Sequence, residues 1–160
     1  MTITVAHRKD AGEILALQKL AFVSEAVTSQ NFNIPPLLQT LEEMVNDFEE
    51  YIFLKMVENG KIIGSVKALV KEKTCYIGRL IVHPDYQNQG FGTCLMKKIE
   101  SMFVGCSRFE LYTGEKSVQN IRFYQNLGYR IFKVQKISEQ LSLLYLEKII
   151  HPLKMYELRI

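Results

Sequence analysis

The sequence predicts a single α+β domain in which a central, mostly antiparallel sheet is flanked by helices. Runs of β-branched and aromatic residues with period-two alternation are joined by short turns, which is typical of neighbouring antiparallel strands. Other segments repeat apolar residues at helical spacing and separate the later strands. The chain has 160 residues, 48% of them hydrophobic and 23% charged, which suits one core of ordinary size.

The first part of the chain is expected to hold one strand and two helices. Thr2–Val5 alternates and is β-branched, so it predicts a strand. Asp10-Ala-Gly-Glu13 has the form of a capping box that opens a helix, and Pro35-Pro36 ends this helix or the loop after it. Thr40-Leu-Glu-Glu43 is a second capping box, for a short helix to about Asp47.

Three strands are then expected to form an antiparallel meander. Tyr51–Val57 and Lys61–Val70 are the first two, joined by the hairpin dipeptide Asn59-Gly60. Gly64 marks a possible bulge in the second strand. Thr74–Val82 is the third strand of the meander.

The next three segments are expected to form a helix, a strand and a second helix. Apolar spacing predicts a helix from about Gly90 to Phe103, followed by a strand over Arg108–Tyr112. Ser117 is a candidate N-cap for the second helix, and Gly128 stands where a left-handed glycine ends it.

A hairpin and a tail are expected to complete the domain. Tyr129–Ile137 and Leu141–Ile149 are the two strands of the hairpin. His151-Pro152 then interrupts the pattern, so we expect one domain over residues 1–160 with a C-terminal tail over 150–160.

Charge is unevenly distributed along the chain. Residues 1–60 carry 4 Lys and Arg against 9 Asp and Glu, a net charge of −5, whereas residues 61–160 carry 16 against 8, a net charge of +8. One interpretation is a cationic substrate on one side and an anionic cofactor on the other. The other, which we favour, is that solvated helix faces happen to segregate.

Composition and spacing argue against several classes of protein. No apolar stretch approaches the roughly 20 residues of a membrane span, and the N-terminus lacks the pattern of a secretory signal. The three cysteines and three scattered histidines form neither a disulfide framework nor a metal motif. The basic residues are dispersed, which does not favour nucleic-acid binding. We therefore expect a cytoplasmic protein with no metal ion and no membrane or nucleic-acid partner.

The loop Gln87-Asn-Gln-Gly-Phe-Gly92 is the most informative stretch, because a strand runs into it and a helix begins from it. Gly90 and Gly92 lack a Cβ and allow a ligand to approach the backbone closely. The first turn of a helix has free N–H groups and a partial positive charge, so the loop predicts a phosphate or pyrophosphate site. Thr93 adds a hydroxyl donor.

Other phosphate motifs fit this loop less well. No Gly-Lys-Ser/Thr follows, so it is not a Walker A loop. The dinucleotide fingerprint needs parallel strands, whereas a meander precedes this loop. A tight strand-to-helix turn with no ligand remains the alternative.

Two blocks of the sequence resemble the GCN5-related N-acetyltransferase (GNAT) family. The loop from Gln87 to Gly92 is similar to the family signature Gln/Arg-x-x-Gly-x-Gly/Ala. The segment Asn120-Ile-Arg-Phe-Tyr-Gln-Asn-Leu-Gly-Tyr129 is similar to the family pattern Asn-x-x-x-x-Tyr-x-x-x-Gly-Phe/Tyr. The order and separation of the blocks, and the order of elements over nearly the whole chain, also match. The resemblance implies the acyl-CoA N-acyltransferase fold.

The resemblance also implies that acetyl-CoA is the co-substrate. In the family, the backbone of the loop binds pyrophosphate and the preceding strand pairs with the pantetheine arm. A free N–H on that strand, that of Ile81 or its neighbour, would polarise the thioester carbonyl. The implied cofactor-binding residues are Leu80, Ile81, Val82, Gln87, Asn88, Gln89, Gly90, Phe91, Gly92, Thr93 and Asn120.

Two residues of the second block carry implied roles. Asn120 matches the family asparagine that binds the cofactor, although an amide near a helix start also serves as a cap. Tyr124 matches the family tyrosine that protonates the leaving thiolate, although it also suits a core aromatic at helical spacing.

The general base is not set by the resemblance. Some family members use a glutamate on the strand before the loop, but this chain has no carboxylate between Glu72 and Asp85. Glu25 and Glu115 are the candidates, each also readable as a solvated surface charge, and a water relay is the default. The segment from Ser24 to Pro36 is the expected lid on the substrate side.

Two functions therefore remain. The first is an enzyme, an N-acetyltransferase that moves an acetyl group from acetyl-CoA to a primary amine of a small molecule or polypeptide by direct attack. The second is a non-catalytic acyl-CoA-binding module with the same fold, although Tyr124 argues for the enzyme. The acidic residues 1–60 mildly favour a cationic acceptor, and residues 141–160 offer a possible homodimer surface.

Overall fold

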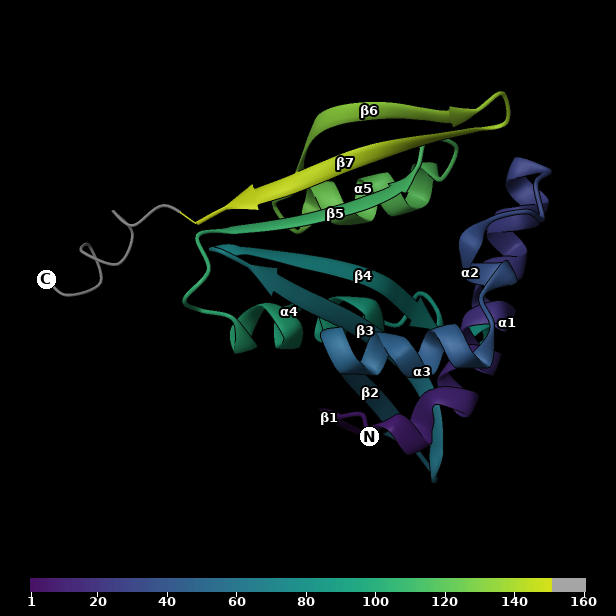
Figure 1. The fold of residues 1–160 in the computed structure, drawn as a ribbon, viewed down its shortest axis with the longest axis vertical. Helices are drawn as coiled ribbons and strands as arrows, with labels where there is room; N and C mark the ends of the chain where they lie inside the picture. Colours follow the sequence, from purple (N-terminus) through teal and green to yellow (C-terminus); the bar gives the residue numbers. More distant parts are fainter. Residues whose placement is uncertain (151–160) are drawn as a thin grey trace, which may run out of the picture.

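The computed structural model, which describes residues 1–150, contains one seven-stranded mixed sheet with helices on its faces (Figure 1). The strand order is β1-β2-β3-β4-β5-β7-β6, and every neighbouring pair is antiparallel except β4 and β5. The predicted α+β class with a mostly antiparallel sheet is confirmed. The predicted tail lies almost wholly outside the described residues.

The strands follow the predicted order and differ from the predicted bounds by a few residues at most. They are β1 (Thr2–Val5), β2 (Ile52–Glu58), β3 (Lys61–Lys71), β4 (Thr74–Val82), β5 (Arg108–Gly114), β6 (Arg130–Ser138) and β7 (Leu141–Ile149). The helices are α1 (Ala11–Ser29), α2 (Pro35–Leu38), α3 (Leu41–Glu50), α4 (Phe91–Met102) and α5 (Val118–Asn126). Short 3₁₀ turns, Arg8–Asp10 and Pro84–Tyr86, precede α1 and α4.

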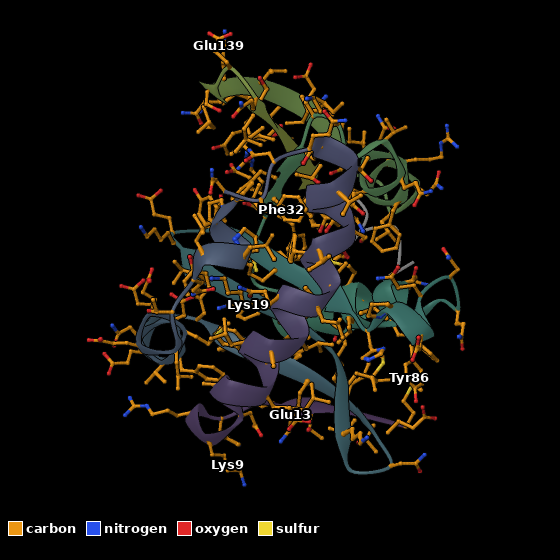
Figure 2. The ribbon with its side chains drawn as sticks, turned by 90° about the vertical axis from the view of Figure 1, so that its right-hand side faces the viewer. Lys9, Glu13, Lys19, Phe32, Tyr86 and Glu139 are labelled. Atoms are coloured by element: carbon orange, nitrogen blue, oxygen red, sulfur yellow. The ribbon has the colours of Figure 1, made fainter. Side chains whose placement is uncertain are left out.

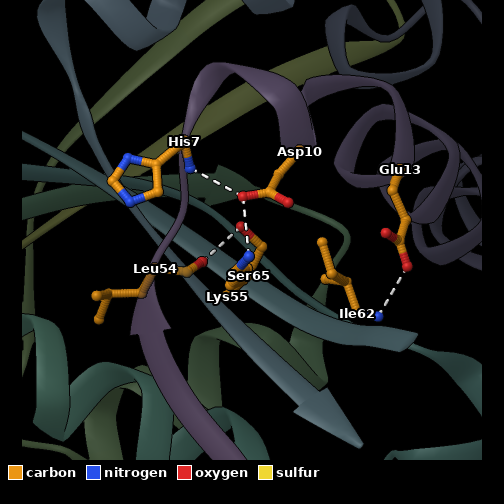
Figure 3. A network of polar contacts seen from close by, with 7 residues as sticks. All are labelled: His7, Asp10, Glu13, Leu54, Lys55, Ile62 and Ser65. Atoms are coloured by element: carbon orange, nitrogen blue, oxygen red, sulfur yellow. Dashed lines mark hydrogen bonds and ion pairs between the residues drawn. The ribbon is translucent and has the colours of Figure 1, made fainter. Parts of the chain in front are cut away.

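The start of α1 differs from the prediction, because its two acidic residues do not form a capping box. Asp10 accepts hydrogen bonds from the N–H of His7 (2.9 Å) and from Nζ of Lys55 (3.0 Å), and Glu13 accepts one from the N–H of Ile62 (2.9 Å) (Figure 3). Partial burial opposes ionisation of Asp10, but the His7 and Lys55 contacts hold its pKa below the ordinary value. Both carboxylates thus link the start of α1 to the sheet through hydrogen bonds.

The segment around the two prolines also differs from the prediction. Pro35 and Pro36 begin α2, a helical turn that the sequence analysis missed. Proline suits the first turn of a helix because its φ is preset and its missing N–H would have had no partner there. The capping box of Thr40 and Glu43 does form, and α3 continues past the predicted end to Glu50.

The predicted hairpin turn and bulge are confirmed by the backbone. Asn59 and Gly60 both have positive φ, 50° and 77°, as a tight turn between β2 and β3 requires. Met56 pairs with Gly64, whereas Val57 pairs with Ile62, so the pairing register shifts beside Gly64.

Two apolar clusters hold the helices to the sheet. One lies between the sheet and α4 and includes the fully buried Leu95 and Ile99. The other lies beneath α1 and α3 and includes Ile14, Met44 and Phe53. The sheet is therefore covered on both faces over β2, β3 and β4. No helix within residues 1–150 is long and apolar enough to cross a membrane.

Candidate active site

The sheet opens between β4 and β5, and this opening defines the site. The two strands pair over only three residues, the last pair being Tyr76 and Glu110, although β4 continues to Val82 and β5 to Gly114. Figure 1 shows the strands running side by side and then parting toward α1. Beyond Tyr76, the backbone groups of β4 on this side have no partner strand.

A bulge in β4 accompanies the opening. Between the pairs Ser65–Ile81 and Lys67–Gly78, β4 contains one residue more than β3. Arg79 lies in this bulge with a φ of 50°, a left-handed conformation that is uncommon for a residue with a side chain. A bulge bends a strand and increases its twist, which turns the end of β4 away from β5.

The backbone of Val82, rather than that of Ile81, faces the opening. The N–H of His83 donates to Ile63 O on β3 (2.8 Å), so the alternation of a strand turns the groups of Val82 away from β3. Nε2 of Gln87 donates to Val82 O (3.0 Å) from the loop, in agreement with this orientation. Of the two N–H groups expected to polarise the thioester, that of Val82 is therefore turned toward the opening and that of Ile81 toward β3.

A cavity of about 740 Å³ occupies the region beside this opening. Its wall is formed by the end of β4 with the following loop, by one side of α1, and by the start of α5. It brings together nearly all the predicted cofactor residues: Leu80, Ile81, Val82, Gln87, Asn88, Gly90, Phe91, Gly92, Thr93 and Asn120. Gln89 does not line it, and its Nε2 instead donates to Asp85 O (3.4 Å).

The glycine loop places the N-terminus of α4 on this wall. Gly90 is the N-cap residue and has a φ of 85°, a conformation that glycine adopts without strain. A Cβ on Gly92 would lie 3.4 Å from Cζ of Phe123 on α5, so little room separates the loop from α5. The start of α4, whose first-turn N–H groups have no partner within the helix, thus lies on the cavity wall. The pyrophosphate site at this loop stays a prediction.

Of the two candidate bases, Glu25 lines the cavity and Glu115 does not. Glu25 is half-buried on α1, and its Oε1 accepts a hydrogen bond from Oγ of Ser117 (2.7 Å), just before α5. Ser117 is the N-cap residue of α5, as predicted, but its side chain makes no cap bond and instead joins α5 to α1. Glu115 is exposed and lines an adjoining cavity of about 70 Å³, whose lining also includes Glu25 and Ser117.

Tyr124 lies on α5 and is not among the residues that line the cavity. Its ring packs edge to face against Phe123 and Tyr129, at centroid distances of 5.2 and 6.1 Å. Burial raises the pKa of Tyr124 well above its ordinary value, and the charge of Glu25 adds to this effect. Tyr124 therefore stays protonated at neutral pH and lies within electrostatic reach of Glu25.

Two aromatic residues of the cavity wall, Phe22 on α1 and Tyr86 in the 3₁₀ turn before the loop, were not predicted from the sequence. Ser24 and Thr28 also line the cavity, and both belong to the segment expected on the substrate side. Figure 2 shows α1 across the front of the molecule, with Tyr86 to its right and Glu139 at the tip of the β6–β7 hairpin. Within the expected lid, residues 24–29 belong to α1, residues 30–34 form a loop and Pro35 begins α2. Its role on the substrate side stays a prediction.

Within residues 1–150, no group of three or more His, Cys, Asp or Glu side chains is arranged to hold a metal ion. His83, the histidine nearest the loop, uses Nδ1 to accept a hydrogen bond from the N–H of Asp85 (3.1 Å), which is a structural role.

Comparison with known proteins identifies a family model and several relatives. The model of the acetyltransferase (GNAT) family matches residues 15–129. The UPF0157 protein YqkA of Bacillus subtilis is 26% identical over 133 residues, which are 83% of this chain and 38% of that protein. An acetyltransferase of Yersinia pestis is 31% identical over 94 residues, which are 56% of this chain and 64% of that protein. The chain thus spans less than two thirds of the length of these relatives.

Solved structures share the fold at low sequence identity. The ribosomal-protein-S18-alanine N-acetyltransferase from Escherichia coli has a TM-score of 0.78 at 17% identity, over 93% of each chain. The YncA putative acetyltransferase from Salmonella typhimurium, solved with its cofactor acetyl-CoA, has a TM-score of 0.73 at 18% identity, over 94% of each chain.

Proposed function

Because the chain belongs to the acetyltransferase (GNAT) family, we propose that it transfers an acetyl group from acetyl-CoA to a primary amine by direct attack. The observation that carries this proposal is the position of the cavity, which joins the unpaired end of β4 to the free N–H groups of α4. An extended amide-bearing chain with a pyrophosphate at one end matches both features.

The cavity suggests which residues hold acetyl-CoA. The backbone N–H groups from Gly90 to Thr93 bind the pyrophosphate, assisted by the positive end of the α4 dipole. Leu80 to Val82 pair with the pantetheine arm as a neighbouring strand does. Asn120 contributes a side-chain amide from the opposite wall.

The cavity wall supplies two groups for the chemistry, the N–H of Val82 and the carboxylate of Glu25, and Tyr124 supplies a third from α5, outside the lining. The N–H of Val82 stabilises the oxyanion that forms when the neutral amine attacks the thioester carbonyl. The carbon–sulfur bond then breaks, and the hydroxyl of Tyr124 donates a proton to the leaving thiolate, which restores CoA as a thiol. Glu25, directly or through water, accepts the proton that the amine loses.

The first test is calorimetric binding of acetyl-CoA to the wild type and to Gly90→Glu. The variant places a side chain and a negative charge where the pyrophosphate should lie, so we expect measurable binding by the wild type and its loss in the variant. Gly105→Glu is the matched control, because Gly105 lies outside the cavity and a Cβ there meets no atom within 4 Å. Failure of the folded wild type to bind acetyl-CoA would contradict the proposal.

A second experiment separates an enzyme from a non-catalytic acyl-CoA-binding module. Release of free CoA thiol is measured with a panel of amines, for the wild type and Tyr124→Phe. We expect the variant to bind acetyl-CoA normally and to turn over on the order of 100-fold more slowly, as loss of a general acid predicts. Binding without turnover by the wild type would favour the binding module.

A further inference from the structure

Arg79 is exceptional among the cations of residues 1–150, because it is half-buried and has no carboxylate partner. Each of the other Lys and Arg side chains that is at least half-buried forms an ion pair: Lys55 with Asp10 (3.0 Å), Lys67 with Asp47 (3.0 Å), Arg108 with Glu110 (2.7 Å) and Lys148 with Glu100 (3.1 Å). A partly desolvated guanidinium without an anion is unfavourable, so its retention calls for an explanation.

The backbone and the side chain of Arg79 are both under constraint. The residue lies in the β4 bulge with a φ of 50°, which disfavours any residue with a Cβ. Its Nε is buried and has no hydrogen-bond partner. Neither the backbone conformation nor the packing therefore accounts for an arginine here.

Charges of both signs lie around the neighbours of Arg79, and within residues 1–150 none forms an ion pair with it. Lys67 pairs with Gly78, the neighbour of Arg79, and a Cβ on Gly78 would lie 3.7 Å from Cε of Lys67. Burial lowers the pKa of Lys67, and the positive charge of Arg79 acts in the same direction against the attraction of Asp47. Asp47 is shared between Lys67 and Nε2 of Gln39 (2.8 Å), so it does not neutralise Arg79.

The acidic first part of the chain does not supply the missing anion. Its carboxylates are mostly engaged in internal contacts: Asp10 with Lys55, Glu13 with the N–H of Ile62, Glu25 with Ser117, Glu43 with Thr40, Asp47 with Lys67, and Glu49 with Arg8. The charge of Glu50 acts on Tyr51 and Lys67, but Glu50 forms no ion pair with Arg79. The net charge of −5 over residues 1–60 therefore says little about the charge of the acceptor.

Arg79 is also close to the reacting end of the cavity. The next residue, Leu80, lines the cavity, and Val82 presents its N–H to the same opening. Arg79 lies on the part of β4 that no longer pairs with β5, beyond the last pair at Tyr76. Arg79 itself does not line the cavity, and its charge acts on Tyr51 and Lys67. An acceptor that reached the opening from the side of these two residues would therefore meet the guanidinium.

We propose that Arg79 binds a carboxylate of the acceptor and selects amines that carry one close to the reacting nitrogen. This inference rests on the proposed acetyl transfer. Guanidinium and carboxylate match in shape and form paired charge-assisted hydrogen bonds, which a neutral carboxamide does not replace. The acceptor class is thus amino acids and related amino carboxylic acids.

The test compares acceptors that differ only at the carboxylate. Free amino acids and the corresponding amino acid amides are supplied with acetyl-CoA, and CoA release gives kcat/KM for each pair. We expect the wild type to favour the carboxylate member by about 10- to 100-fold, as loss of a charge-assisted hydrogen bond predicts. Arg79→Asn should remove this preference through a higher KM for the carboxylate, while asparagine tolerates the left-handed backbone.

Controls separate recognition from folding and from acetyl transfer itself. Arg8→Gln removes one positive charge from an exposed pair with Glu49 and should keep the wild-type preference. Arg79→Lys retains a charge without the paired geometry and should show an intermediate preference. Equal kcat/KM for both members of each pair in the wild type would overturn this inference alone. Absence of turnover with every amine, despite acetyl-CoA binding, would overturn the proposed function and this inference with it.

Discussion

Glu25 joins two elements that the sequence places far apart. Oγ of Ser117 donates to Glu25 Oε1 at 2.7 Å, and a Cβ on Gly114 would lie 3.3 Å from the same oxygen. A glutamate held this way loses less conformational freedom when it accepts a proton than a freely rotating one does. The contact also brings its negative charge within reach of Tyr124, whose raised pKa keeps the phenol protonated.

The first prediction compares the two candidate bases. Glu25→Gln keeps an oxygen for Ser117 but loses the ability to take up a proton, so kcat/KM for the amine should fall about 10-fold or more. Acetyl-CoA affinity should be unchanged, because the side chain is not proposed to hold the cofactor. Glu115→Gln, outside the main cavity, should leave both quantities at the wild-type level.

Thiol release measured across pH 6 to 9 checks this comparison, with calorimetry for the cofactor. Loss of activity in Glu115→Gln together with unchanged kinetics in Glu25→Gln would reverse the assignment.

Among the elements, the crossing of α4 over β3 gives a second prediction. A Cβ on Gly64 would lie 2.9 Å from Cδ1 of Leu95 and 3.2 Å from Ile81 O, so the backbone of β3 leaves no room for a methyl group. Gly64→Ala should lower the free energy of unfolding by about 1 to 3 kcal/mol, as overpacking of a core does.

Urea unfolding measures this effect, with Gly12→Ala as the matched control. Gly12 lies within α1, and a Cβ there meets no atom within 4 Å. Alanine is favoured over glycine in a helix by up to about 1 kcal/mol, so this variant should be as stable as the wild type or more stable. Equal destabilisation by both variants would contradict the packing argument.

Local signals in the sequence were sufficient to predict most elements. Asn59-Gly60, the Thr40–Glu43 box and Gly128 each require a particular backbone conformation, and the structure shows it at all three. The Asp10–Glu13 box failed because long-range partners, Lys55 and Ile62, compete for the same carboxylates. A short stretch of sequence cannot reveal these contacts, because Lys55 and Ile62 lie far from Asp10 and Glu13 along the chain.

Within the candidate site, too, some features could be predicted from the sequence and others could not. The place of the loop from Gln87 to Thr93 between a strand and a helix was predictable, because the glycines and the helical spacing after them are local signals. The β4 bulge at Arg79 was not predicted, because it depends on the register with β3 and on a positive φ at a residue that ordinarily avoids it. The contact of Glu25 with Ser117 joins residues 92 positions apart and follows only from the tertiary fold.

In the whole molecule, the sheet has two parts that meet over a short seam. Strands β1 to β4 form one part and β5, β7 and β6 the other, and three residue pairs between β4 and β5 connect them. The cavity lies where these parts diverge, and its wall includes β4 and α1 on one side and the start of α5 on the other. A ligand bound there contacts both parts, so its binding free energy stabilises their arrangement.

This arrangement gives the last prediction, on hydrogen exchange along β4. The N–H of Val82 faces the opening, whereas the backbone of Ile81 faces β3 and pairs with Ser65. Acetyl-CoA that lies along β4 as an added strand should slow exchange at Val82 by about 10-fold or more and change Ile81 much less. Residue-resolved exchange is measured on the wild type and Gly90→Glu, each with and without acetyl-CoA. Slowing at Val82 that persists in Gly90→Glu, or appears equally along the distant β6, would show that the ligand stabilises the fold without occupying the gap.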